Sequence, residues 1–145
     1  MRAFAVLLAL CLWPHHAGAA ERRAAFPGPV AARVETVLDG DSFRAEAMVW
    51  PGHTVSVVIR IRGIDAPEKR AACRRERIGA GRARRALAGM IGDATVLVSN
   101  VAGAKYYGRV LADVTTLDGR PVASELLARD LVRPYDGGRR GPWCP

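Results

Sequence analysis

Residues 54–64 constrain the fold more than any other segment, because they alternate between apolar and polar side chains as a half-buried β-strand does. One face of this strand carries four β-branched residues: Val55, Val57, Ile59 and Ile61. The opposite face carries Arg60 and Arg62. The segment therefore predicts a sheet that packs one face on a core and turns two guanidinium groups away from it.

The rest of the chain supplies four further strands and two helices. Strands are predicted at residues 34–38, 42–50, 95–101 and 109–115. Between residues 70 and 91 the period becomes that of a helix, with an apolar stripe made of Ala83, Leu87, Met90 and Ile91, and residues 122–129 predict a shorter second helix. This order predicts an α+β fold that is mainly β, a small closed barrel of five strands with helices packed against it.

The first residues have the layout of a secretory signal peptide. Arg2 precedes an apolar run from residue 4 to residue 13, and small residues at positions 17–19 follow where a signal peptidase cleaves. The run is too short to cross a bilayer, and the alternatives are an uncleaved anchor or a buried helix. We therefore expect a signal peptide at residues 1–19, a flexible lead-in at residues 20–33 and one domain at residues 34–145, in a periplasmic or secreted protein.

Two cysteines, Cys73 and Cys144, remain after removal of the signal peptide. An exported protein enters an oxidising compartment, where a pair of cysteines forms a disulfide by default. The alternative is a metal ligand or a catalytic thiol, but neither cysteine has a Cys or His close by in the sequence. We expect a Cys73–Cys144 disulfide that ties the end of the chain to its middle.

The charge balance points to polyanionic partners. The chain has 22 Lys and Arg residues against 14 Asp and Glu residues, a formal net charge of +8. This balance favours nucleic acid, phosphates or an anionic membrane surface and disfavours cationic ligands. With 50% hydrophobic and 25% charged residues, a disordered tail, a collagen-like repeat and a multi-span membrane protein are excluded.

Two aspartates, Asp41 and Asp65, lie at equal distances along the chain on either side of His53. A hairpin that turns near His53 sets their carboxylates opposite one another at its open end. Close carboxylates repel each other unless a cation lies between them, and oxygen ligands select a hard cation, calcium or magnesium. Calcium is the expected ion outside the cytosol.

Arg60 and Glu68 add the groups that phosphodiester hydrolysis needs. Pro67 restricts the backbone around it, so Glu68 is held close to the end of the strand that carries Arg60. A metal orients water, a carboxylate takes its proton, and arginines stabilise charge on the phosphate. Each residue also has an ordinary explanation, as a turn acid, a solvated strand face or a helix-start residue, and only their combination predicts a site.

Four motifs carry a family resemblance. In chain order they are Asp39-Gly40-Asp41-Ser42, the stretch Arg60-Ile61-Arg62-Gly63-Ile64-Asp65-Ala66-Pro67-Glu68, Tyr107-Gly108-Arg109, and the looser Asp118-Gly119 through Leu131. On these motifs the chain resembles the staphylococcal-nuclease-like (thermonuclease) family. The resemblance implies a five-stranded OB-fold barrel. It also implies calcium-dependent hydrolysis of single-stranded DNA and RNA that leaves 3′-phosphate ends. We further expect a monomer without stable membrane association.

The resemblance also implies a role for each matching residue. The carboxylates of Asp41 and Asp65 and the backbone carbonyl of Ala66 would bind Ca²⁺. Glu68 would be the general base, and Arg60 and Arg109 would hold the phosphate and stabilise the transition state. Tyr107 would flank the bound nucleotide. The resemblance thus implies three catalytic residues, Arg60, Glu68 and Arg109, three metal-binding residues, Asp41, Asp65 and Ala66, and one substrate-binding residue, Tyr107.

The chain departs from the family pattern at three places. Ala66 stands where the family often has Thr, and Lys105-Tyr106 stands where it often has Asp-Lys. The C-terminal helix of the family is replaced by a tail rich in Gly, Pro and Arg. Two alternatives stay open: an inactive OB-fold module that only binds single-stranded nucleic acid, and a structural domain whose basic helix binds anionic lipid or polysaccharide.

Overall fold

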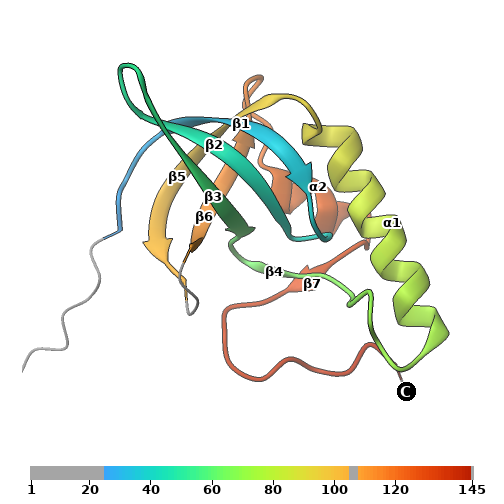
Figure 1. Cartoon of the computed structure of the whole chain (residues 1–145). Helices are drawn as coiled ribbons and strands as arrows, with labels where there is room; N and C mark the ends of the chain where they lie inside the picture. Colours follow the sequence, from blue (N-terminus) through green and yellow to red (C-terminus); the bar gives the residue numbers. More distant parts are fainter. Residues whose placement is uncertain (1–24, 105–107, 145) are drawn as a thin grey trace, which may run out of the picture.

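The computed structural model describes residues 25–104 and 108–144, so Tyr107 and the expected signal peptide lie outside the described residues. The elements, in chain order, are β1 (Val30–Val37), β2 (Ser42–Trp50), β3 (His53–Ile61), β4 (Ile64–Asp65), α1 (Arg74–Ile91), β5 (Thr95–Gly103), β6 (Arg109–Thr116), α2 (Val122–Ala128) and β7 (Arg133–Pro134). Five strands close into a barrel in the order β1-β2-β3-β6-β5, and β4 pairs separately with β7 (Figure 1). The predicted fold class, a mainly β barrel with two helices, is confirmed.

The barrel closes through one parallel pair. β3 and β6 run parallel, with Val58 opposite Arg109 and Arg60 opposite Leu111, whereas the other four barrel pairs are antiparallel. The chain needs a long crossover to make a parallel pair, and α1 lies within that crossover. The closure thereby brings Arg60 and Arg109 onto neighbouring strands.

Two element boundaries differ from those predicted. β1 begins at Val30, so residues 30–33, expected in the lead-in, are strand residues that pair with residues 95–98 of β5. This pairing partner is remote in sequence and leaves no local signal at residues 30–33. The predicted strand at residues 54–64 is also interrupted, because Gly63 adopts a φ of 81° and turns the chain between β3 and β4.

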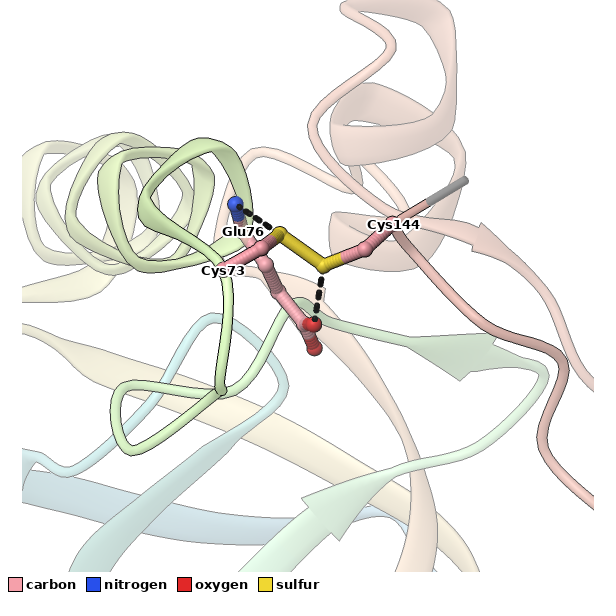
Figure 2. Close-up of side chains that lie close together, drawn as sticks. All are labelled: Cys73, Glu76 and Cys144. Carbon is pink, nitrogen blue, oxygen red and sulfur yellow. Dashed lines mark hydrogen bonds between the residues drawn. A yellow bond between two sulfur atoms is a disulfide. The ribbon is translucent and has the colours of Figure 1, made fainter.

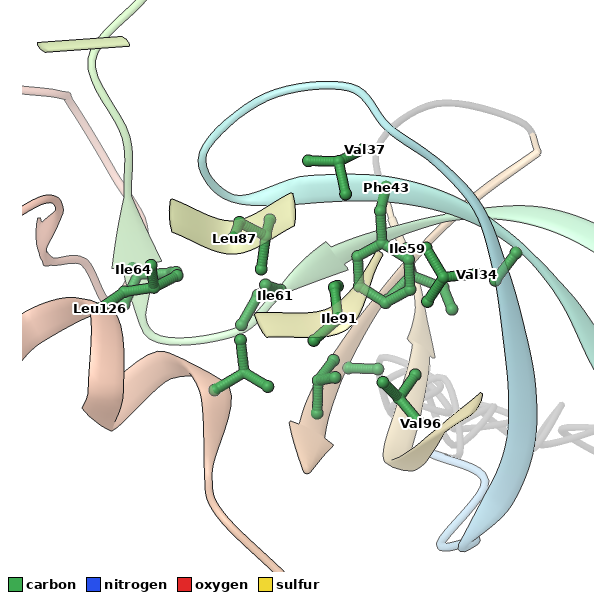
Figure 3. Close-up of a cluster of buried hydrophobic side chains, with 14 of the residues drawn as sticks. Val34, Val37, Phe43, Ile59, Ile61, Ile64, Leu87, Ile91, Val96 and Leu126 are labelled. Atoms are coloured by element: carbon green, nitrogen blue, oxygen red, sulfur yellow. The ribbon is translucent and has the colours of Figure 1, made fainter. Parts of the chain in front are cut away.

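The core lies between the barrel interior and one face of α1 (Figure 3). Phe43 and Ile59 from the barrel meet Leu87 and Ile91 from α1, and Leu126 adds the buried side of α2. All five are almost completely buried, and burial of such a side chain stabilises a fold by roughly 1.5–3 kcal/mol. The helix is therefore held firmly against the barrel, beside the point where β4 leaves it.

A disulfide joins Cys73 to Cys144, as predicted, with Cα atoms 6.3 Å apart and a sequence separation of 71. Cys73 is also the N-cap of α1, since its sulfur accepts a hydrogen bond from the Glu76 backbone N–H (Figure 2). Cys73, Glu76 and Cys144 lie close enough together to suggest a metal site. Both sulfurs are used in the disulfide, however, so neither is available as a thiolate ligand. The bond fastens the tail after β7 to the start of α1 (Figure 1) and is compatible with export.

Within residues 25–104 and 108–144, neither helix combines the length and the hydropathy that a membrane-spanning helix requires.

Candidate functional site

The β2–β3 ladder positions Asp41 at one end of the barrel. Ser42 pairs with Arg60, and the Ile61 backbone N–H donates to the Asp41 carbonyl at 2.9 Å. Asp41 therefore lies opposite Ile61, and the simple hairpin that sets Asp41 directly opposite Asp65 is wrong in register. Asp65 nevertheless lies near Asp41, because the turn at Gly63 folds the chain back and brings Asp65 to the same region from β4.

Arg60 joins the two carboxylates. Its Nη1 lies 2.9 Å from Asp41 Oδ2, and its Nη2 lies 3.7 Å from Asp65 Oδ1. The three side chains are only 13%, 6% and 1% exposed, respectively, so these charges interact with little screening by water. The structure thus brings together the aspartate pair and the first arginine that the sequence singled out.

Burial is the largest influence on the pKa of Asp41. Removal from water raises the pKa of this carboxyl above its ordinary value, and the nearby Asp65 charge acts in the same direction. The Arg60 guanidinium and the Ala66 backbone N–H, which donates to Asp41 Oδ2 at 3.0 Å, pull the pKa down but do not cancel the effect. An additional positive charge nearby would therefore favour the ionised form of Asp41.

The two oxygens of Asp65 have different surroundings. Oδ2 accepts hydrogen bonds from Arg133 Nε and Nη2, at 3.2 and 3.1 Å, and from Trp143 Nε1 at 3.3 Å. Oδ1 is buried and has no hydrogen-bond donor among the described residues; it lies 3.1 Å from Arg140 Nε without hydrogen-bond alignment. A buried carboxylate oxygen normally accepts a hydrogen bond, so Oδ1 keeps the capacity to bind a cation or a hydrogen-bond donor.

Glu68 lies at the mouth of the site. Its side chain is 58% exposed and forms an ion pair with Arg140, while its backbone N–H donates to Glu76 Oε1 at 3.1 Å. A cavity of about 100 Å³ brings the predicted groups together; it is lined by Asp39, Asp41, Ser42, Arg60, Ala66, Pro67, Glu68, Arg109 and Arg140. Arg109, predicted from a separate motif, thereby shares one cavity with Arg60 and Glu68.

Sequence reasoning missed three residues of the site, Arg133, Arg140 and Trp143. All three come from β7 and the tail, and they reach Asp65 from positions 68 to 78 residues away. Arg133 also stacks on Trp143, with its guanidinium carbon 4.3 Å from the ring centroid. The one signal that could have found them was Cys144, since a disulfide to Cys73 must draw the adjacent tail across the end of β4.

A hard divalent cation fits the donor set. Asp41, Asp65 and Glu68 contribute carboxylate oxygens, which are the ligands that calcium prefers, and Asp65 Oδ1 is buried without a hydrogen bond. Burial is the main cause of the raised pKa of Asp41, and a bound cation would act against it by favouring the ionised carboxylate. No His or Cys is among the described residues that line this cavity, so they do not suit a metal that prefers nitrogen or sulfur ligands.

A larger hollow of about 670 Å³ adjoins the site through Arg60. It is lined by Arg62, Tyr135 and Leu111, among others, and Arg60 lies 6.0 Å from the centre of the Tyr135 ring. An aromatic ring beside a guanidinium group suits a nucleobase attached to a phosphate.

Comparisons with known proteins give no further guidance: no protein-family model matches the chain, and no curated protein matches it.

Proposed function

We propose that the protein is an exported, calcium-dependent nuclease that hydrolyses the phosphodiester bonds of single-stranded DNA and RNA and leaves 3′-phosphate ends. Its motifs resemble those of the thermonuclease family. The observation that carries the proposal is the single cavity in which Asp41, Arg60, Glu68 and Arg109 meet, beside the buried Asp65. A module that only binds nucleic acid has no use for this combination.

Asp41 and Asp65 would hold the calcium ion, together with the Ala66 carbonyl. When bound, the ion would neutralise the phosphate and lower the pKa of a coordinated water. Arg133 and Trp143 donate to Asp65 Oδ2, which fixes this carboxylate and leaves Oδ1 without a hydrogen bond from the described residues. These tail residues thereby orient a ligand of the ion without touching the substrate.

Arg60 and Arg109 would bind the scissile phosphate. Guanidinium groups on neighbouring strands can donate paired hydrogen bonds to the equatorial oxygens, and these bonds strengthen as charge accumulates there. Arg140, 40% exposed, forms ion pairs with both Asp65 and Glu68 and would add a third guanidinium group beside the phosphate. The site then presents three guanidinium groups to the substrate.

Glu68 would take the proton of the attacking water. The water oxygen bonds to phosphorus, the bond from phosphorus to the 5′-oxygen breaks, and the leaving oxygen gains a proton from solvent. Tyr107 would flank the nucleotide, and Tyr135 would contact the base in the adjoining hollow.

The test is hydrolysis of denatured DNA by the mature protein. We expect activity with calcium, none after chelation, and a loss of about 10²-fold or more in Glu68→Gln. The matched control is Glu46→Gln, because Glu46 is paired with Arg33 on the outside of the barrel. This variant should hydrolyse DNA at the same rate as the parent. Binding of DNA without hydrolysis would instead identify an inactive OB-fold module, and hydrolysis that survives chelation would remove the metal from the proposal.

A further inference from the structure

A third cavity, of about 720 Å³, lies between the start of α1 and the end of α2. We call it the arginine groove and define it by six of its lining residues: Pro67, Arg74, Arg75, Arg82, Arg129 and Trp143. Two of these residues connect it to the candidate site. Pro67 also lines the site cavity, and the Trp143 indole donates to Asp65.

The groove carries more positive charge than its own acids balance. Arg74, Arg75 and Arg82 form no hydrogen bond or ion pair with the described residues, and Arg129 has only a loose ion pair, 3.6 Å from Glu125. The groove also includes Glu76 and Asp130, which offset two of its four positive charges and leave an excess of two. Three guanidinium groups are therefore free to bind an anion.

The position of two of these arginines opposes the stability of the helix. Arg74 and Arg75 occupy the first turn of α1, where the helix dipole disfavours a cation. The apolar face of α1 accounts for its packing and gives no reason for arginine at these two positions. A polyanion bound in the groove does give one.

The floor of the groove suits a chain of nucleotides. Gly79 lets α1 approach Pro67, since a Cβ there would come within 3.3 Å of the proline ring. Ile78 is 46% exposed, and Trp143 offers an aromatic ring beside it. Sugars and bases can lie on such apolar groups while the arginines hold the phosphates.

We propose that the arginine groove binds the phosphodiester backbone of a single strand as it leaves the candidate site, so that the preferred substrate is a polynucleotide spanning both cavities. The inference rests on the proposed function, because the strand enters the groove from the site that cleaves it. It predicts that affinity and KM depend on the length of the substrate through these arginines alone.

The experiment measures binding of fluorescein-labelled oligothymidylates by anisotropy, in the full mature chain with Glu68→Gln to prevent cleavage. The groove variant combines Arg74→Gln, Arg75→Gln and Arg82→Gln. The control combines Arg44→Gln, Arg85→Gln and Arg120→Gln, which removes the same charge outside the groove. We expect the groove variant to weaken binding of a 12-mer by at least about tenfold and to reduce the salt slope by about 2, with a 2-mer unaffected.

Equal losses in both variants, or none in the groove variant, would overturn the inference. Vesicles of phosphatidylglycerol form a second arm, and groove-dependent binding to vesicles but not to the 12-mer would also overturn it. Circular dichroism checks the fold, and the groove variant should melt no lower than the parent because cations leave the first turn of α1. Failure of the proposed function is seen separately, as absence of hydrolysis in the chain that retains Glu68.

Discussion

Removal of the Cys73–Cys144 disulfide should destabilise the protein and disturb the site together. The bond closes a loop across 71 positions of sequence, and the loss of unfolded-state entropy that such a loop imposes is worth about 4 kcal/mol. For a domain of this size the corresponding fall in Tm is about 15 °C. The variant to make is Cys73→Ser with Cys144→Ser.

Serine is the informative replacement at position 73. Cys73 is the N-cap of α1, and a serine hydroxyl caps a helix at least as well as a sulfur does. The double variant therefore removes the covalent link and keeps the cap, so the measured change reports the link. Thermal denaturation followed by circular dichroism gives Tm for the oxidised protein, the reduced protein and the double variant.

We expect the reduced protein and the double variant to melt at the same lowered temperature, and the reductant to leave the double variant unchanged. Calcium-dependent activity should also decrease at temperatures below Tm, at which the variant is still folded. The reason is that Arg133, Arg140 and Trp143 reach Asp65 from the segment that the disulfide fastens. A Tm within about 3 °C of the parent would refute the reasoning, since the loop-entropy argument allows no such small effect.

Two further predictions concern the interior. Asp41→Asn should abolish activity and raise Tm at neutral pH. Burial raises the pKa of Asp41 in the folded state, so the folded protein binds the proton more tightly than the unfolded chain and its stability declines as pH rises above the carboxyl's ordinary range. Melting curves of the parent and the variant from pH 4 to 8 test this, and an unchanged pH profile in the variant would contradict it. Leu87→Ala should cost about 3 kcal/mol in urea unfolding because it opens a hole between α1 and the barrel, and a loss below about 1 kcal/mol would show that the core can collapse around it.

The barrel was predictable because its signals are local. Alternation in residues 54–64 and a turn near His53 are enough to define the central hairpin, and the stripe containing Leu87 defines the packed face of α1. The first residues of β1 were missed because their partner, β5, is remote in sequence and they lack an alternating pattern. Long-range pairing decides such segments, and a short window of sequence does not contain it.

The residues of the candidate site also differ in how far their proximity could be predicted from local sequence. Asp41, Arg60 and Asp65 come from adjoining segments, so their proximity followed from one hairpin, although the Gly63 turn corrected the register. Arg133 and Arg140 reach Asp65 only because β7 pairs with β4 and the disulfide anchors the tail. Nothing in the residues around either arginine distinguishes it from a solvated surface charge.

The parallel pairing of β3 with β6 has a consequence for how the protein acquires its function. Arg60 and Arg109 become neighbours only when β3 pairs with β6, two strands that α1 separates in the sequence. Contacts between segments so distant in sequence slow the folding of a domain. Recovery of phosphate binding during refolding should therefore lag behind the helical signal, and would report when this parallel pair has formed.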